Sequence, residues 1–380
     1  MKTKKIVGLL TAISLSFASV SQALACTSIL ITDAEGRGYH GRTLEYSVLI
    51  PTSMTYFPQK TKIISSTPTG VQGLTFETKY AMLGMTAPIM ETAKQVTLAE
   101  GMNDQGLSFS MNWLNGTTSP SVGKDPSKIL AASDLGAWIL GNFKSVEEVK
   151  QAMTNGSTEI WVPIVKSLDP NYPLPQHYAI NDKRGGSIVI EFTSGKANVY
   201  DNPVGVLTNG PNFQWHLQNL SNYTFTNVDK NTGQLGKLKL ATQDSGIALT
   251  ALPSAQTSQG RFVKAAFYAN YVRKAKTPDE AVVTLGHIMN NFDRPYDLTV
   301  DGSGGTGDGV RTSPRSSEVT VWTVMNDLSR NLFYFRSINA MNWAVVDMNK
   351  LKDVKQIKSV SNFDIDQAGA DSFKLFYISK

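Results

Sequence analysis

The 380-residue chain contains a single cysteine, Cys26, so no disulfide within the chain can hold its fold together. Exported proteins that use cysteine for stability carry even numbers, because every disulfide needs two partners. An unpaired thiol in an oxidising compartment is open to oxidation, so the presence of Cys26 requires another explanation. With 41% apolar residues, the chain is long enough for a hydrophobic core in one large or two ordinary domains.

The residues before Cys26 have the features of a signal peptide. Three lysines form a basic start, an apolar run covers residues 6–20, and Ala23-Leu24-Ala25 places small residues at the positions that a signal peptidase inspects. That run is too short for a transmembrane helix, and no later segment has the roughly 20 uninterrupted apolar residues that a span needs. We therefore predict that residues 1–25 are removed. The mature chain, residues 26–380, is expected to have no stable membrane anchor and to be periplasmic, or secreted if the source is not Gram-negative.

The charge and the motif content exclude several classes of function. Loss of the leader and its three lysines lowers the formal net charge from +5 to +2, and no basic stripe with interleaved aromatic residues favours nucleic-acid binding. Zinc-ligand spacing, Gly-x-Ser-x-Gly and His-Glu-x-x-His are absent from the sequence. The glycine-rich segment Gly302–Gly309 lacks the ending of a phosphate loop, and we interpret it as a surface loop. We expect no metal, no organic cofactor and no nucleic-acid partner.

Cys26 allows three interpretations. It is a small buried residue, although cleavage after Ala25 places it at the chain end. Alternatively it is the acylated cysteine of a lipoprotein, but Ala23 replaces the expected leucine-like residue and the following 27–31 segment resembles a strand rather than a tether. In the third interpretation it is an N-terminal nucleophile, and its α-amine, with a pKa near 7.7–8.0, exchanges protons at neutral pH. A nearby cation that lowers the thiol pKa would improve the nucleophile, and no histidine is needed.

Alternating and helical patterns predict runs of strands that are interrupted by blocks of helices along the mature chain. Strands are expected at 27–31, Tyr39–Leu44, Val96–Met102, Leu107–Trp113, Tyr178–Asn181, Ser187–Phe192, Ala197–Tyr200, Val204–Thr208, Val319–Met325, Leu332–Arg336 and Trp343–Asp347. Helices are expected at Asp134–Asn142, Val146–Thr154 after a cap at Ser145, Phe213–Tyr223, Arg261–Lys274 and Pro278–Asn291 after Thr277. Runs of strands interrupted by paired helices favour two packed sheets flanked by helices, with no linker and no internal repeat.

A series of short motifs extends over essentially the whole mature chain. In order they are Cys26-Thr27, Gly41-Arg42-Thr43-Leu44-Glu45, Tyr80-Ala81-Met82-Leu83-Gly84-Met85, Glu100-Gly101-Met102-Asn103 with Gly106-Leu107, Gly205-Val206-Leu207-Thr208-Asn209, Asn219-Leu220 and Arg261-Phe262. Each is weak alone, but their order and spacing together are specific. They resemble the choloylglycine hydrolase and penicillin V acylase family of N-terminal-nucleophile hydrolases. The resemblance implies an α+β protein with a four-layer αββα fold in one domain, hydrolysis of a side-chain amide on a non-peptide substrate, and a homotetramer.

Position by position, the resemblance implies roles for individual residues. Cys26 is the nucleophile with its own amine as proton shuttle, and Arg42 is the cation beside the thiolate. Glu45 stands where the family has an aspartate that holds the amine, and Asn209 is the side-chain amide of the oxyanion hole. Arg261 is a second active-site arginine. Without the resemblance, the sequence would suggest that Arg42 forms a salt bridge at a strand end and that Asn209 is a turn residue. Arg261 would be interpreted as a solvated charge at the start of a helix.

The second oxyanion position is open between two neighbours. Counting from Gly106 places Trp113 where family members have asparagine or tyrosine, and its indole N–H is able to donate. Asn112 is the alternative donor. If Trp113 is not the donor, it either forms an aromatic wall for the acyl group or packs in the core. We predict that Tyr46, Trp113 and Asn112 are substrate-binding residues.

We accordingly expect an exported N-terminal cysteine amidase or acylase acting between a hydrophobic acyl group and a small polar amine. Penicillin V and long-chain N-acyl homoserine lactones are the leading substrates, because the leader, Trp113 and Glu45 resemble the Gram-negative branch of the family. Conjugated bile salts are the alternative. A non-catalytic lipoprotein or binding module is the rival outside this class.

Overall fold

The computed structural model of the chain describes residues 25–46, 52–87, 94–166, 173–223, 232–241, 247–296, 298, 318–368 and 376. The expected loop at Gly302–Gly309 and all of the predicted signal peptide except Ala25 lie outside these residues. Ala25 is still joined to Cys26, so the Cys26 nitrogen is a peptide amide here. Among the described residues, no helix is long and apolar enough to cross a membrane.

Two large antiparallel sheets form the centre of the molecule. The first has six strands in the order β14 (Val206–Leu207), β1 (Ala25–Thr32), β2 (Gly38–Tyr46), β17 (Val319–Asp327), β18 (Leu332–Ser337) and β19 (Ala344–Asp347). The second has eight strands in the order β13 (Lys196–Asp201), β12 (Ser187–Thr193), β11 (Gln176–Asp182), β8 (Leu107–Trp113), β7 (Thr97–Asn103), β6 (Met82–Ala87), β3 (Ser53–Phe57) and β20 (Lys358–Ser361).

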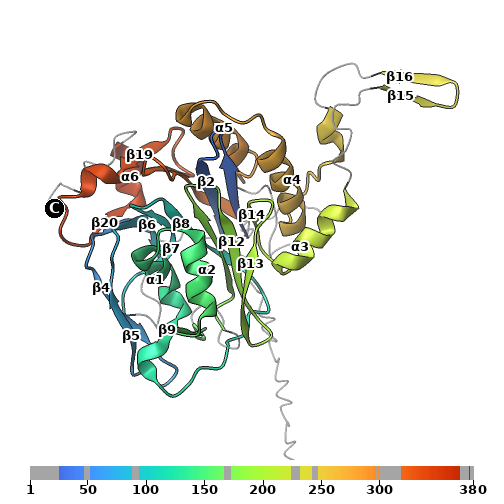
Figure 1. Cartoon of the computed structure of the whole chain (residues 1–380). Helices are drawn as coiled ribbons and strands as arrows, with labels where there is room; N and C mark the ends of the chain where they lie inside the picture. The colour runs from blue at the N-terminus through green and yellow to red at the C-terminus, as the bar shows by residue number, and fades with distance from the viewer. Residues whose placement is uncertain are drawn as a thin grey trace, which may run out of the picture.

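Helices cover the outer faces of both sheets (Figure 1). Helices α1 (Leu135–Asn142) and α2 (Val146–Thr154) pack on the eight-stranded sheet, and α4 (Ser258–Tyr271) and α5 (Pro278–Asn290) pack on the six-stranded sheet. Helix α3 (Phe213–Asn219) follows β14, and α6 (Asn362–Ala368) lies near the C-terminal end. These layers confirm the predicted four-layer αββα architecture.

Strand β1 shows how a period-two sequence serves two cores. Cys26 and Leu30 lie in the cluster between the sheets, whereas Ile29 and Ile31 pack against α4 and α5. In the neighbouring strand, a side chain at Gly41 would bring its Cβ to 2.8 Å from the sulfur of Met289. Glycine at this position therefore allows α5 to pack closely on β2 directly before Arg42.

The capping predictions are confirmed. Ser145 accepts a hydrogen bond from the Glu148 amide, and Thr277 accepts one from the Glu280 amide. Helix α4 begins at Ser258, earlier than predicted, because Thr257 caps it by accepting from the Gly260 amide.

The patterns missed several strands and misjudged one. Strands β3, β6 and β20 of the large sheet were not predicted, and β14 is shorter than the expected Val204–Thr208 because Gly205 turns the chain with a φ of +70°. Three smaller two-stranded pairs were also missed: β4 (Lys62–Ser66) with β5 (Gln72–Glu77), β9 (Ile129–Ala131) with β10 (Glu159–Trp161), and β15 (Thr232–Leu235) with β16 (Leu238–Ala241).

Candidate active site

Cys26 and Arg42 meet on adjacent strands. Cys26 lies opposite Leu44 in the β1–β2 ladder and Arg42 lies opposite Ser28, so both side chains project into the space between the sheets. Arg42 Nη2 donates to Cys26 Sγ at 3.3 Å, and each residue is only 1% exposed. The structure thus brings the predicted nucleophile and the predicted cation into direct contact.

The charges around the thiol act in opposite directions. Burial raises the pKa of Cys26, because a buried thiolate loses its hydration, and Glu45 raises it further. Arg42 and Arg261 lower the pKa by stabilising the thiolate. The two arginines therefore oppose the desolvation that would otherwise keep the thiol protonated.

On the side away from the sulfur, Arg42 is held by hydrogen bonds to residues of β8 and by an aromatic ring. Its Nε donates to Asn112 Oδ1 at 3.1 Å, its Nη2 also donates to the Met111 carbonyl, and its guanidinium carbon lies 5.0 Å from the ring centre of Trp322. Glu100 Oε2 is 3.9 Å from Arg42 Nε. These contacts hold the guanidinium beside the sulfur of Cys26.

Asn112 does not occupy the oxyanion position. Its amide nitrogen donates to the carbonyls of Leu207 at 3.2 Å and Thr208 at 2.9 Å, while its oxygen receives Arg42. Both amide protons are therefore engaged with backbone. The expectation that Asn112 binds substrate or completes the oxyanion hole is corrected: this residue orients Arg42.

The backbone of Cys26 is bound by Asn209 and Arg261. The Cys26 nitrogen donates to Asn209 Oδ1 at 2.8 Å, and the Cys26 carbonyl accepts from Arg261 Nη1. Arg261 also donates from Nη1 to Thr27 Oγ1 at 2.7 Å and from Nη2 to Asn209 Oδ1 at 2.7 Å. Arg261 is buried in the first turn of α4, so it is neither solvated nor peripheral.

Asn209 spans the site from the nucleophile to β8. Its Nδ2 donates to the Trp113 carbonyl at 3.0 Å, which uses one of the two amide protons. To act as an oxyanion donor, Asn209 would have to use the other amide proton. The structure thus brings Asn209 into contact with the backbone of Cys26, and its role as an oxyanion donor stays a prediction.

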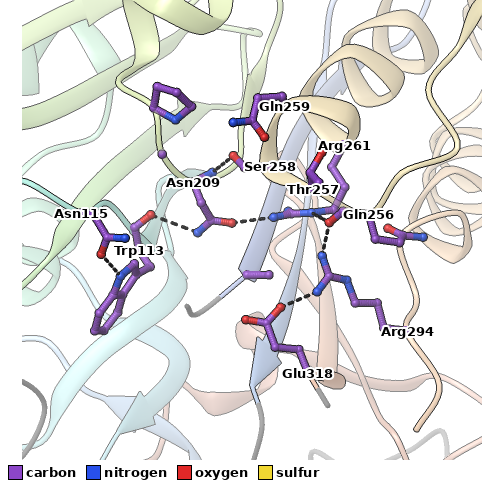
Figure 2. A pocket seen from close by; sticks show the side chains of 13 residues that line it. Trp113, Asn115, Asn209, Gln256, Thr257, Ser258, Gln259, Arg261, Arg294 and Glu318 are labelled. Atoms are coloured by element: carbon purple, nitrogen blue, oxygen red, sulfur yellow. Dashed lines mark hydrogen bonds and ion pairs between the residues drawn. The ribbon is translucent and has the colours of Figure 1, made fainter. Parts of the chain in front are cut away.

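A cavity of about 580 Å³ opens beside these residues (Figure 2). It is lined by Ala25, Trp113, Asn115, Asn209, Gly210, Pro211, Gln256, Thr257, Ser258, Gln259, Arg261, Arg294 and Glu318. Trp113 Nε1 donates to Asn115 Oδ1 at 2.7 Å, so the indole is fixed as a wall and its N–H is already engaged. Tyr46 is half-buried at the end of β2 and is not part of the described lining.

Glu45 belongs to a buried charged cluster that sequence reasoning only partly foresaw. Its Oε1 accepts from Thr320 Oγ1 at 3.3 Å, and burial raises its pKa while Arg261, Arg294 and Arg42 act to lower it. Arg294 forms an ion pair with Glu318 and donates to the Gln256 carbonyl. No motif marks Arg294 or Glu318 in the sequence; only the packing of the segments around β17 brings them to the cavity.

The fold and the site together define a class of protein. A cysteine at the start of the first strand of an αββα sandwich, with a cation on its sulfur and an asparagine amide on its nitrogen, is the arrangement of an N-terminal-nucleophile hydrolase that cleaves linear amides.

Comparison with known sequences makes this assignment specific. The sequence profile of the linear amide C–N hydrolases, choloylglycine hydrolase family, matches residues 26–360. The chain belongs to this family and is a linear amide hydrolase.

Three proteins that are similar to this chain in sequence or structure illustrate the comparison. A bile salt hydrolase/transferase from Clostridium perfringens is 32% identical over 347 residues, which cover 88% of this chain and 98% of that protein. A crystal structure of a variant of the conjugated bile acid hydrolase from the same species superimposes with a TM-score of 0.72 at 28% identity, covering 88% of this chain and 96% of the other. The penicillin V acylase from Agrobacterium tumefaciens has a TM-score of 0.67 at 22% identity, covering 88% and 90%.

Proposed function

We propose that the mature chain hydrolyses conjugated bile salts, at the amide that joins the steroid acid to its amino-acid conjugate. The main support for this proposal is that the Cys26–Arg42–Asn209 site lies in a chain that is 32% identical, over 88% of its length, to a bile salt hydrolase/transferase. This reverses the ranking drawn from sequence, which put penicillin V first. At 22% identity, the likeness to the penicillin V acylase supports a common fold alone.

In the proposed reaction the Cys26 thiolate attacks the amide carbonyl. The oxyanion accepts a hydrogen bond from Asn209 Nδ2. The α-amine of Cys26, freed by leader removal, takes the proton of the thiol and passes it to the leaving amine. Asn209 Oδ1 already accepts from the Cys26 nitrogen at 2.8 Å and would orient the lone pair of that amine. The first step leaves a thioester on Cys26, and water then releases the acid.

Penicillin V and long-chain N-acyl homoserine lactones form the second candidate substrate class. The observation in their favour is Trp113, whose indole lines the cavity and is fixed by Asn115. A rigid flat wall suits the phenoxy ring of penicillin V.

A substrate panel tests this ranking. Protein beginning at Cys26 is assayed with glycocholate, penicillin V and a long-chain acyl homoserine lactone, with Cys26→Ser as the inactive control. We expect the highest kcat/KM for glycocholate. A higher kcat/KM for either of the other two would refute the bile-salt assignment and leave the amidase chemistry intact.

We also propose that residues 1–25 are removed on export and that the product is periplasmic, or secreted if the source is not Gram-negative. Intact mass and N-terminal sequencing test this proposal. A free Cys26 at the N-terminus supports it, whereas a lipidated cysteine would support the lipoprotein alternative.

We further propose a homotetramer. The β15–β16 hairpin projects from the body of the molecule (Figure 1), and its Leu235 and Leu238 are 71% and 61% exposed. Exposed leucines on a projecting hairpin suit burial against another subunit. Light scattering on the mature protein is expected to give four times the chain mass, and a monomer would contradict the proposal.

A further inference from the structure

Two buried histidines that the proposed reaction does not use bind the loop that carries Asn209. His216 Nε2 is 2.9 Å from the Asn209 carbonyl oxygen, and His177 Nε2 is 3.1 Å from the Thr208 carbonyl oxygen. Both histidines are fully buried. Two consecutive carbonyls at the predicted oxyanion residue are thus each held by an imidazole.

The hydrogen-bond partners determine the protonation of His216. A carbonyl only accepts, so the Nε2 of His216 carries the proton that reaches Asn209. Burial lowers the pKa of His216 to about 4, so the ring is neutral at pH 7. The ring also stacks on Phe262 of α4, with centroids 4.5 Å apart and planes inclined by 17°. His216 is therefore a fixed, uncharged donor.

The second histidine, His177, is also held by hydrogen bonds on both sides of its ring. The Nδ1 of His177 lies 2.9 Å from Glu191 Oε1, so this ring stands between a carbonyl and a carboxyl group. Because a carbonyl only accepts, the Nε2 of His177 is the donor to Thr208. Asn112 donates to the same Thr208 carbonyl.

Both backbone groups of Asn209 are consequently anchored. Its nitrogen donates to Ser258 Oγ at 3.0 Å, and its oxygen receives His216; Ser258 Oγ lies 3.4 Å from the same histidine nitrogen. With the backbone held at both groups, the point from which the Asn209 side chain projects is fixed. That side chain joins Cys26 to Trp113.

We propose that His216 is a positioning residue for the oxyanion hole, which acts by holding the backbone of Asn209 so that its side-chain amide faces the oxygen of the carbonyl under attack. The inference rests on the proposed amide hydrolysis by Cys26. It assigns no proton transfer to His216, because a neutral donor bound to a backbone carbonyl stays protonated throughout. Its effect should therefore reach the reaction only through Asn209.

The test uses two variants of one residue and a matched control. His216→Phe keeps an aromatic ring on Phe262 but removes the donor, whereas His216→Gln restores an N–H at the position of Nε2. His287→Phe, at an exposed histidine of α5, controls for the substitution itself. Asn209→Ala and the Asn209→Ala/His216→Phe double variant complete the set.

Two reactions separate orientation from nucleophilicity. Acylation of Cys26 by p-nitrophenyl acetate passes through an oxyanion and is followed as the burst of p-nitrophenolate. Alkylation by iodoacetamide needs the thiolate but forms no oxyanion. Because the ester is activated, the first readout does not depend on which amide is the natural substrate. A protein that cleaves no amide would refute the proposed function yet still report on His216.

We expect His216→Phe to lower the acylation rate about 10- to 100-fold, a part of the 10²–10³ that a whole oxyanion donor contributes. Its alkylation rate and the pH profile of that rate should match wild type, and His216→Gln should recover most of the loss. In the Asn209→Ala background, His216→Phe should have no further effect. An unchanged acylation rate in His216→Phe, a parallel fall in alkylation, or a full additional loss in the double variant would each overturn the proposal.

Discussion

Replacing Arg42 by methionine should make Cys26 a poor nucleophile at neutral pH. Arg42 Nη2 lies 3.3 Å from Sγ, and methionine fills a similar volume without charge. Opposite charges about 4 Å apart interact by about 4 kcal/mol at an effective dielectric constant near 20. Since 1.36 kcal/mol corresponds to one pKa unit, the thiol pKa should rise by about 2 to 3 units, with Arg261 as the remaining cation.

The assay is the pH dependence of iodoacetamide alkylation on protein that begins at Cys26. At pH 7 the rate should fall about 100- to 1000-fold, because each unit of pKa above the working pH lowers the thiolate fraction about tenfold. Arg273→Met, at an exposed arginine paired with Glu280, is the matched control, and a thermal melt verifies folding. An alkylation profile displaced by less than about half a unit would refute the assignment of Arg42 as the activating cation.

Three further predictions follow from the site. Cys26→Ser should abolish turnover with little change in Tm, and residual turnover would refute the nucleophile. Asn112→Ala should lower the rates of alkylation and turnover together about tenfold, because Arg42 loses a hydrogen bond that holds it. A fall in turnover alone would indicate instead that Asn112 is an oxyanion donor. The pKa of His216 is about 4 when folded and about 6.5 when unfolded, so the unfolded chain binds more protons between these values and stability falls as pH drops. Urea unfolding should show that this residue contributes about 2 kcal/mol of lost stability between pH 7 and pH 5, reduced in His216→Gln; an unchanged pH dependence in that variant would contradict it.

Local sequence determined most of the elements around the site. In β1, Cys26 and Leu30 face one apolar neighbour, whereas Ile29 and Ile31 face another on the opposite side of the strand. Capping residues such as Ser145 and Thr277 act within one turn of the helices they begin, so these helix starts can be predicted from the local sequence alone.

Strands β3, β6 and β20 could not be recognised in the same way. Strand β20 pairs with β3 across about 300 residues of sequence, joining Lys358 to Tyr56 and Ser361 to Ser53. Their stability comes from ladder partners and from the inter-sheet core, which contains Met54 and Val360, rather than from a regular pattern of their own.

The sequence by itself determined the chemistry of this protein: one thiol, at a predicted cleavage site, followed by motifs that supply an arginine and an asparagine. Only the tertiary structure decided which neighbour does what. Asn112 and Trp113 are adjacent, so their side chains point to opposite faces of β8, and sheet packing turns Asn112 towards Arg42 while Trp113 lines the cavity. Likewise Arg294 and His216 reach the site through folding alone, because their partners lie on other elements of the chain.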